Sequence, residues 1–476
     1  YRRSFSPPAG QGGRVLLHFG AVDYRCTVWV NGQQAGEHQG GYWPFALDIT
    51  DLLCPAGDDQ LWVAVQDPTD RSPGARGKQS LHPGGMFYPA QSGIWQTVWL
   101  ERVPDNYICS LTVEPDFDQR QVRVRVHTSQ PGGAVNLWAA VRAGGVCIAE
   151  DWGSDEADQE GELVLDIPEE HFFPWSPDHP FLYDLSVAVP GGDQVHSYFA
   201  LRKWSCAPDR QGVLRFCLNG KPLLLNGLLD QGYWPEGLYT PPSDAAVEQE
   251  LQRVKERGFY LTNALLPLLR RMPDGPSRCR LLGRGDAAAR DEYRRELTDT
   301  VQALRCHPCI GCWVPFNEGW GQFDAAAATA ALRQLDPTRL VDEASGWYDQ
   351  GGGDADSRHS YFYPLRVKPG RRTVALSEYG GIAWPMPGHE SPGKVYGYGK
   401  AASRTDLTQR YQKLQLKKVL PLLRCGLSAL VYTQLTDVEE EVNGLFTYDR
   451  AELKPKATAV RSVNAALAAE FARLTN

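Results

Sequence analysis

Two hydrophobic segments of this chain each end in a glutamate. The first is Trp-Val-Pro-Phe-Asn-Glu-Gly-Trp-Gly at residues 313–321, and the second is Leu-Ser-Glu-Tyr-Gly-Gly at residues 376–381. In a β/α barrel the C-terminal end of each strand opens into the active site, so Glu318 and Glu378 would face a common ligand. Two carboxyl groups in such a place are typical of acid/base and nucleophile chemistry on a sugar.

The elements that must position these glutamates divide the chain into three stretches. Residues 1–103 read as short alternating strands separated by Gly, Pro and Asp, with an Asn-Gly turn at 31–32, which predicts a jelly-roll β-sandwich. Residues 104–202 contain further short strands at a spacing typical of an immunoglobulin-like β-sandwich. Strands are expected here at 15–19, 26–30, 60–66, 96–100, 121–127, 134–142, 162–167 and 182–188.

From residue 203 to 476 the pattern changes to strands that alternate with amphipathic helices. This alternation predicts a (β/α)8 TIM-type barrel or an open parallel sheet. A hairpin is expected at Asn219-Gly220, and Ser243 is placed to cap a helix that Gly258 ends. A further helix is expected at 286–304, and barrel strands are expected at 222–229, 310–316, 339–344, 359–363, 374–378 and 427–434.

The composition is that of a protein with several hydrophobic cores and a modest acidic charge. Its 476 residues carry 49 basic and 57 acidic side chains, a net charge of −8, which disfavours a nucleic-acid partner. No segment is long and apolar enough to predict a membrane span. The 14 tryptophans and 20 tyrosines suit stacking on sugar rings, although filling of the cores explains aromatic residues equally well.

The 11 cysteines show no disulfide-module spacing, which favours a reducing, cytoplasmic compartment over a secreted or periplasmic one. The chain opens at Tyr1 without a leader, so localisation stays open. The segment Cys-His-Pro-Cys-Ile-Gly-Cys at 306–312 has a spacing that a metal site could use. Because it leads directly into the strand before Glu318, we expect its cysteines to act as small apolar residues, and we expect neither a metal nor a cofactor.

Several segments together resemble the family-2 glycoside hydrolases, and the resemblance covers nearly the whole chain. The segments at 23–32, 40–45 and 92–99 resemble the sugar-binding jelly roll of that family. The segment Asn-Gly-Lys-Pro at 219–222 resembles the hairpin that leads into its barrel. Asn317-Glu318 and Ser377-Glu378 match the positions of its acid/base and nucleophile glutamates.

The resemblance implies a retaining exo-β-glycosidase that acts on a carbohydrate by double displacement. Glu318 would be the acid/base, with a pKa raised by a neighbouring charge and partial burial, and Glu378 the nucleophile. Asn317 would hold the sugar 2-hydroxyl. The Asn-x-Lys pair of the glucuronidases does not follow Glu378, so a β-galactoside-type substrate is favoured over a uronic acid. Self-association of the chain stays open.

Further substrate contacts are expected where other apolar runs end. Barrel rims also hold structural polar and aromatic groups, so each of these side chains has a purely structural alternative. The candidates are Asp230, Trp234, Trp347, His359, Tyr361, Tyr363, Trp384 and Gln434.

The chain departs from the family pattern between Phe259 and Cys309. About fifty residues are too few for two strand-and-helix units of ~30 residues each, which predicts that the barrel lacks about one unit. Tyr1 falls within the early strands of the jelly roll, as though the N-terminus were clipped. The alternative hypothesis is therefore a catalytically inactive carbohydrate-binding or remnant protein of the same fold.

Overall fold

The computed structural model describes residues 1–10, 12–55, 57–71, 74–130, 135–155, 160–263, 286–361, 364–391 and 393–475. These residues form two compact units, and each is described by itself. The first unit comprises Tyr1–Asp67, Gly93–Trp204 and Thr298–Gly311, and the second comprises Pro68–Ser92, Ser205–Leu297 and Cys312–Asn476. Within the described ranges, no helix has the length and apolar character needed to cross a membrane.

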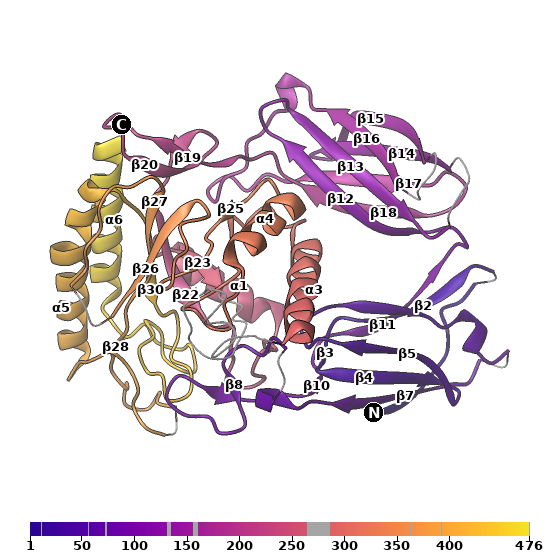
Figure 1. The fold of residues 1–476 in the computed structure, drawn as a ribbon, viewed down its shortest axis with the longest axis horizontal. Coiled ribbons are helices and arrows are strands. Elements are labelled where there is room, and N and C mark those ends of the chain that lie inside the picture. Colours follow the sequence, from indigo (N-terminus) through magenta and orange to yellow (C-terminus); the bar gives the residue numbers. More distant parts are fainter. Residues whose placement is uncertain are drawn as a thin grey trace. The chain divides into compact units, whose positions relative to one another are not determined.

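The first β-sandwich of unit 1 is built from two antiparallel sheets (Figure 1). Alternating residues of both sheets point inward and form a core that includes Phe19, Val28 and Val63. One sheet has the order β1-β7-β4-β5 and the other β11-β2-β6. The strands are β1 (Arg2–Phe5), β2 (Arg14–Phe19), β4 (Arg25–Val30), β5 (Gln33–Gln39), β6 (Phe45–Asp48), β7 (Asp59–Gln66) and β11 (Val98–Val103), with β3 (Val22–Asp23) paired to β10 (Gly93–Ile94).

The Asn-Gly hairpin predicted at residues 31–32 is confirmed. Asn31 has a φ of 51° and Gly32 a φ of 80°, the left-handed conformation that a two-residue hairpin turn needs at both positions. The turn joins β4 to β5 in antiparallel register. A second Asn-Gly turn, at Asn219 and Gly220, has the same conformation and joins β20 (Leu214–Leu218) to β21 (Lys221–Pro222).

The second β-sandwich of unit 1 packs a three-stranded sheet, β12-β13-β16, against a four-stranded one, β15-β14-β17-β18. Val122, Val124 and Val126 alternate into the core from one strand, as a half-buried strand requires. The strands are β12 (Ile108–Asp116), β13 (Gln121–Thr128), β14 (Val135–Ala143), β15 (Val146–Asp155), β16 (Glu160–Asp166), β17 (Tyr183–Ala188) and β18 (Gln194–Phe199). The bounds of β13, β14, β16 and β17 agree with the four strands predicted in this stretch to within two residues, whereas β12, β15 and β18 were not predicted.

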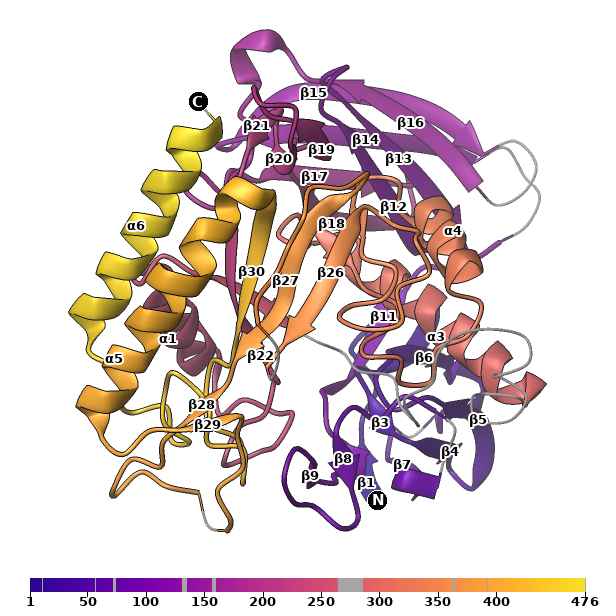
Figure 2. The same cartoon turned by 60° about the vertical axis from the view of Figure 1, so that its left-hand side comes forward.

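Unit 2 is built around a parallel sheet of five strands in the order β23-β22-β30-β27-β26. Figure 2 shows β30, β27 and β26 side by side, with α5 and α6 along the sheet. A separate two-stranded parallel sheet pairs β24 with β25. The strands are β22 (Leu225–Asp230), β23 (Tyr260–Asn263), β24 (Cys312–Trp313), β25 (Leu340–Val341), β26 (Ala355–Ser360), β27 (Thr373–Gly380) and β30 (Leu427–Thr433).

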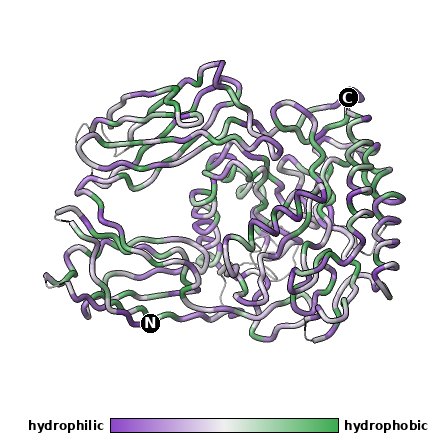
Figure 3. The backbone as a smooth tube through the Cα atoms, turned by 180° about the vertical axis from the view of Figure 1, so that it is seen from behind, coloured by the Kyte–Doolittle hydropathy of each residue, from purple (hydrophilic) through white to green (hydrophobic). Residues whose placement is uncertain are grey.

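The described helices have caps and apolar faces that explain where they lie. The predicted cap Ser243 accepts a hydrogen bond from the Ala246 N–H at 3.2 Å, and Gly258 follows the helix with a φ of 76°. Helix α6 buries Val460, Val463 and Leu467 against the sheet, and its alternating hydropathy is visible in Figure 3. The helices are α1 (Asp244–Lys255), α3 (Ala287–Leu304), α4 (Ala325–Leu335), α5 (Arg404–Leu414) and α6 (Ala457–Thr475).

Short elements complete both units. They are β8 (Gln79–Ser80), β9 (Tyr88–Pro89), β19 (Trp204–Pro208), β28 (Ile382–Ala383), β29 (Gly399–Lys400), and the short helical turns η1 (Thr50–Leu52), η2 (Thr69–Arg71), η3 (Glu169–His171), η4 (Gln415–Val419) and η5 (Leu420–Cys425).

Three of the strands predicted for a barrel differ in the structure. Strands β24 and β25 are only two residues long, because the segments 310–316 and 339–344 leave regular pairing after Trp313 and Val341 and meet again only at an isolated bridge between Asn317 and Ser345. Strand β26 lies at 355–360 instead of 359–363. Its buried positions are Ala355, Ser357 and His359, so two polar residues face inward and the strand lacks an apolar signal.

Among the described residues, the five-stranded sheet and the β24-β25 pair are parallel, as are the short pairs β8-β9 and β28-β29, and no described strand lies between β23 and β24. Most of the shortened segment on which the missing barrel unit was predicted, 264–285, lies outside the described residues.

Candidate active site

Glu318 lies just beyond β24 in an unusual backbone conformation. Its φ is 52°, a left-handed value that costs free energy for a residue with a side chain. The Glu318 N–H donates to the Ser345 carbonyl at 2.8 Å, and Asn317 bridges Ser345 in parallel register, so backbone pairing holds the conformation. The side chain is buried, and the Trp320 indole N–H donates to its Oε2 at 3.3 Å.

Glu378 lies within β27, near the C-terminal end of that strand. The Tyr361 hydroxyl donates a short hydrogen bond to Glu378 Oε2 and also lies 3.0 Å from Thr433 Oγ1. The Tyr361 ring is stacked on Tyr398, with centroids 3.8 Å apart. Because both its ring and its hydroxyl are held, the Tyr361 phenol donates to the Glu378 carboxylate from a fixed direction.

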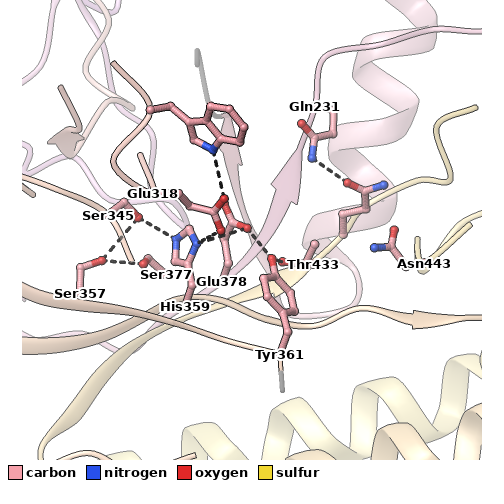
Figure 4. Close-up of polar contacts among 12 residues, drawn as sticks. Gln231, Glu318, Ser345, Ser357, His359, Tyr361, Ser377, Glu378, Thr433 and Asn443 are labelled. Atoms are coloured by element: carbon pink, nitrogen blue, oxygen red, sulfur yellow. Dashed lines mark hydrogen bonds and ion pairs between the residues drawn. The ribbon is translucent and has the colours of Figure 1, made fainter. Parts of the chain in front are cut away.

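His359 contacts both glutamates at once (Figure 4). Its Nδ1 lies 2.9 Å from Glu318 Oε1 and 3.6 Å from Glu378 Oε2, and its Nε2 lies 3.1 Å from Ser345 Oγ. One oxygen of each glutamate and one ring nitrogen all lie within 4.8 Å of one another. Such a group could also coordinate a cation, and within the described ranges it is the one cluster of this kind.

The charges of the site shift its pKa values in directions that the geometry explains. Burial lowers the pKa of His359, but the charges of Glu378 and Glu318 outweigh it, so the pKa is raised overall and the imidazolium is favoured. Burial raises the pKa of Glu378, against the opposing effects of His359 and the Tyr361 hydroxyl. Burial and the neighbouring Glu378 carboxylate raise the pKa of Tyr361 well above its usual range, so its hydroxyl remains a donor.

A line of serine hydroxyls continues from His359 into the sheet (Figure 4). Ser345 Oγ lies 3.5 Å from Ser357 Oγ, which donates to Ser377 Oγ at 2.5 Å. Burial raises the pKa of the nearby Asp342 to about 6, although Ser357 and His359 oppose this shift. The imidazole is therefore held from behind by polar groups, which fixes its ring orientation.

The two glutamates line one pocket, which lies entirely within unit 2. Of the residues predicted from sequence, Glu318, Glu378, Asn317 and Tyr361 line it, and His359 contacts both glutamates. The complete lining is Lys78, Met86, Leu229, Gln231, Asn317, Glu318, Trp320, Tyr361, Glu378, Tyr398, Thr433 and Glu441.

The other predicted contacts that the structure describes do not line this pocket. Gln434 is fully buried and accepts from Gln231 Nε2 at 2.8 Å, so it supports a lining residue. The Trp347 ring lies 6.1 Å from the His359 ring. Trp384 is tied through its carbonyl to Lys454 Nζ at 3.0 Å.

Asp230 and Trp234 follow β22 but are absent from the lining of this pocket. Asp230 accepts from the Gly232 N–H at 2.9 Å, and burial raises its pKa. Trp234 lies under the Arg450 guanidinium, 3.8 Å from it, and lines a second cavity of about 240 Å³. Tyr363 lies outside the described residues.

Sequence reasoning missed several lining residues, most notably Lys78 and Glu441. Lys78 belongs to Pro68–Ser92, a segment that we expected within the jelly roll but that folds with unit 2. Glu441 ends a run of three glutamates, which in a sequence resembles a solvated surface loop. Tyr398 likewise follows no apolar run, so none of these residues carried a local signal.

Comparison with known proteins gives the relatives of this chain. Residues 1–104 match the model of the sugar binding domain of the glycosyl hydrolases family 2. The chain is 24% identical over 418 residues to a β-galactosidase of Thermoanaerobacter pseudethanolicus, a match that covers 82% of this chain and 55% of that protein. It is 25% identical over 435 residues to a β-galactosidase of Klebsiella pneumoniae (80% of this chain, 39% of that protein).

A β-glucuronidase of Rattus norvegicus is 28% identical over 253 residues, which is 45% of this chain and 35% of that protein. The chain thus spans about half or less of the curated relatives that it matches.

Solved structures share the fold over nearly the whole chain. A β-glucuronidase of Bifidobacterium dentium superposes with a TM-score of 0.75 at 17% identity, covering 98% of this chain and 88% of that one. A GH2 β-galacturonidase of Eisenbergiella tayi superposes with a TM-score of 0.73 at 18% identity, covering 98% and 89%. At these identities the likeness concerns the multidomain fold alone. Together with the sugar-binding domain match and the galactosidase and glucuronidase relatives, it supports one conclusion: glycoside hydrolase family 2 is the family that this chain resembles.

Proposed function

We propose that this chain hydrolyses terminal β-linked sugars with retention of configuration. One observation carries the proposal: oxygens of Glu318 and Glu378 lie within 4.8 Å of each other in one pocket, with His359 in contact with both. Retaining glycosidases place their two carboxyl groups about 5–5.5 Å apart, whereas inverting ones need about 6.5–9.5 Å to admit a water.

The first step forms a bond between the Glu378 carboxylate and C1 of the sugar. As the bond from C1 to the leaving oxygen breaks, Glu318 gives its proton to that oxygen, and the alcohol departs. In the second step Glu318 takes a proton from water, the water oxygen attacks C1, and Glu378 leaves as a carboxylate. We assign the nucleophile to Glu378, whose carboxylate is held by the Tyr361 hydroxyl near the C-terminal end of β27.

The neighbouring groups have distinct parts in this proposal. His359 positions both glutamates, and its positive charge favours the ionised form of Glu378 before attack. Asn317 precedes the acid/base and lines the pocket, where its amide can hold the sugar 2-hydroxyl. No step of this scheme uses a metal or a cofactor.

The substrate that we propose is a β-galactoside-type sugar at a chain end. The matches to β-galactosidases cover 80–82% of this chain, whereas the match to the rat β-glucuronidase covers 45%. A pocket lined from several strand ends suits one terminal sugar better than the interior of a polymer.

For the architecture we propose a jelly roll at 1–103, an immunoglobulin-like sandwich at 104–202 and a TIM-type barrel at 203–476. The barrel is supported by the parallel pairing of β22, β23, β26, β27 and β30, because a TIM barrel is built from parallel strands. Such barrels place their active sites at the C-terminal ends of the strands. An experimental structure that shows an open sheet with no closing strand pairs would overturn this assignment.

The test of activity is turnover of a panel of 4-nitrophenyl β-glycosides, with the first product followed by proton NMR. We expect the β-anomer of the free sugar to appear first. Replacement of Glu378 by Ala should lower kcat by at least about 10⁴-fold, because no covalent intermediate can form. Replacement of Glu318 by Ala should cost about 10²–10⁴-fold.

Azide provides a control that separates the two roles. It needs no general base, so with an activated aryl leaving group it should restore turnover to the Glu318→Ala protein as a β-glycosyl azide. In the Glu378→Ala protein azide can only replace the missing nucleophile, and that single displacement gives the α-glycosyl azide. Initial release of the α-anomer would refute retention. A folded wild-type protein that binds sugars without cleaving any of them would instead favour the inactive carbohydrate-binding alternative.

A further inference from the structure

The pocket contains a third carboxylate that the two-glutamate scheme does not use. Glu441 is 2% exposed and lines the pocket together with Glu318 and Glu378. The Tyr88 hydroxyl donates to its Oε2 at 2.5 Å, and Asn443 Nδ2 donates to its Oε1 at 3.2 Å. Two donors within the protein thus hold the two oxygens of this carboxylate.

Lys78 is the cation beside it. Its Nζ lies 3.4 Å from Glu441 Oε2 and 5.4 Å from the centre of the Tyr88 ring, and its side chain is 13% exposed. An ammonium group has three N–H donors, and within the described residues Glu441 is its one hydrogen-bond partner. Lys78 therefore has donor capacity left on a pocket that a ligand would fill.

A buried ion pair is a poor way to gain stability, because desolvation of both charges offsets their attraction. This pair joins residues 363 positions apart, at the wall of the pocket that also holds the two central glutamates. Its placement is better explained by recognition of a polar ligand.

We infer that Lys78 and Glu441 recognise the non-reacting hydroxyl groups of an uncharged sugar and exclude a uronic acid; the inference rests on the proposed glycosidase function. A sugar hydroxyl both donates and accepts, so it can accept from Lys78 and donate to Glu441. A uronate carboxylate can only accept, and any position beside Lys78 brings it close to the Glu441 charge. Among the lining residues three are glutamates and one is a lysine, so the pocket opposes a further negative charge.

The experiment compares neutral and acidic sugars on the wild-type protein and on Glu441→Gln and Lys78→Met. Turnover is measured on 4-nitrophenyl β-galactoside, β-glucoside, β-glucuronide and β-galacturonide. We expect cleavage of a neutral glycoside at least about 100-fold faster than of either uronide. Each substitution should lower kcat/KM for that glycoside about 10–100-fold, the usual effect of losing a hydrogen bond to a charged group.

Deoxy substrates separate recognition from a structural role. For the wild type, kcat/KM should be about 10–100-fold lower on one of the 3-, 4- or 6-deoxy glycosides than on the parent glycoside. The Glu441→Gln and Lys78→Met proteins should lose much less on the same compound, because the contact is already gone. Glu439→Gln is the matched control, since Glu439 accepts from the Tyr448 hydroxyl at 2.9 Å and is absent from the pocket lining. Equal losses in variants and wild type would overturn the inference.

A binding measurement keeps this inference distinct from the proposed activity. Calorimetry with isofagomine and its uronic analogue needs no turnover. Tighter binding of the neutral compound would support the inference even if the protein cleaved no glycoside. Absence of cleavage would refute only the proposed activity. Tighter binding or faster cleavage of the uronic compound, or binding of neither, would overturn the inference while leaving retention of configuration to be judged from the product anomers.

Discussion

Replacement of His359 by Asn is the most informative single change, because it separates charge from geometry at the centre of the site. The Asn side-chain amide can occupy the position of the imidazole Nδ1–H and still donate to Glu318, but it carries no positive charge. It also abandons the 3.1 Å contact between Nε2 and Ser345 Oγ. The variant therefore removes the electrostatic support of Glu378 while keeping a donor beside Glu318.

The expected magnitude follows from the two contacts. The 2.9 Å contact to Glu318 is a charge-assisted hydrogen bond, which is worth ~1.5–3 kcal/mol, and a neutral amide donor keeps roughly half of that. At 3.6 Å the contact to Glu378 is Coulombic, and its loss in a partly relaxed interior adds ~1–2 kcal/mol. Together these give ~2–3 kcal/mol, or about 30–150-fold in kcat/KM.

The direction in which the pH profile of kcat/KM shifts tests whether His359 carries a positive charge. The His359 charge lowers the pKa of Glu378 against the opposing effect of burial. Without that charge the pKa of Glu378 rises, so on acidification its carboxylate becomes protonated at a higher pH. The acid limb of kcat/KM should therefore move to higher pH in His359→Asn.

The assay is kcat/KM for one 4-nitrophenyl glycoside between pH 4 and 9, with thermal unfolding to show that the variant is folded. His389→Asn is the control, because His389 pairs with Asp449 at 2.7 Å and does not line the pocket. An acid limb that stays in place, or that moves to lower pH, would refute a charged His359 as the support of Glu378.

Three further outcomes follow from other contacts. Tyr361→Phe removes the donor on the nucleophile, so kcat should fall about 10–150-fold and the acid limb should move to higher pH. Lys454→Met leaves Asp437 buried without its cation and should lower the free energy of unfolding by ~3–5 kcal/mol at pH 7.5. The loss should shrink at pH 5, since burial raises the pKa of Asp437 to about 6 and protonation then favours the folded state; equal losses in urea titrations at both pH values would contradict this. Arg215→Lys cannot reproduce the fork that bonds Asp209 and two backbone carbonyls, so it should cost ~2–4 kcal/mol in the same titration, and a loss below ~1 kcal/mol would contradict it.

Local patterns in the sequence predicted much of the fold. Alternating apolar residues predicted half of the strands of the two sandwiches, because a half-buried strand must alternate whatever surrounds it. The two Asn-Gly turns and the Ser243 cap were predictable for the same reason, since their chemistry acts within a few residues of chain.

Strand β26 shows where local patterns end. Its buried residues include Ser357 and His359, which are satisfied by Ser377, Ser345 and the glutamates, so no apolar alternation marks it. Burial of a polar side chain is decided by hydrogen-bond partners that lie on other strands. A sequence window cannot contain those partners.

For the candidate site, the sequence by itself singled out Glu318 and Glu378, because each glutamate follows an apolar run that predicted a strand. Only the tertiary structure decided what surrounds them. It placed His359 between the two carboxylates and brought Lys78 to Glu441 across 363 positions. It also left Asp230 and Trp234 out of the pocket lining, although both follow an apolar strand. The reason is physical: a strand's own residues determine where it ends, whereas the direction and partners of a side chain beyond that end depend on packing between distant segments.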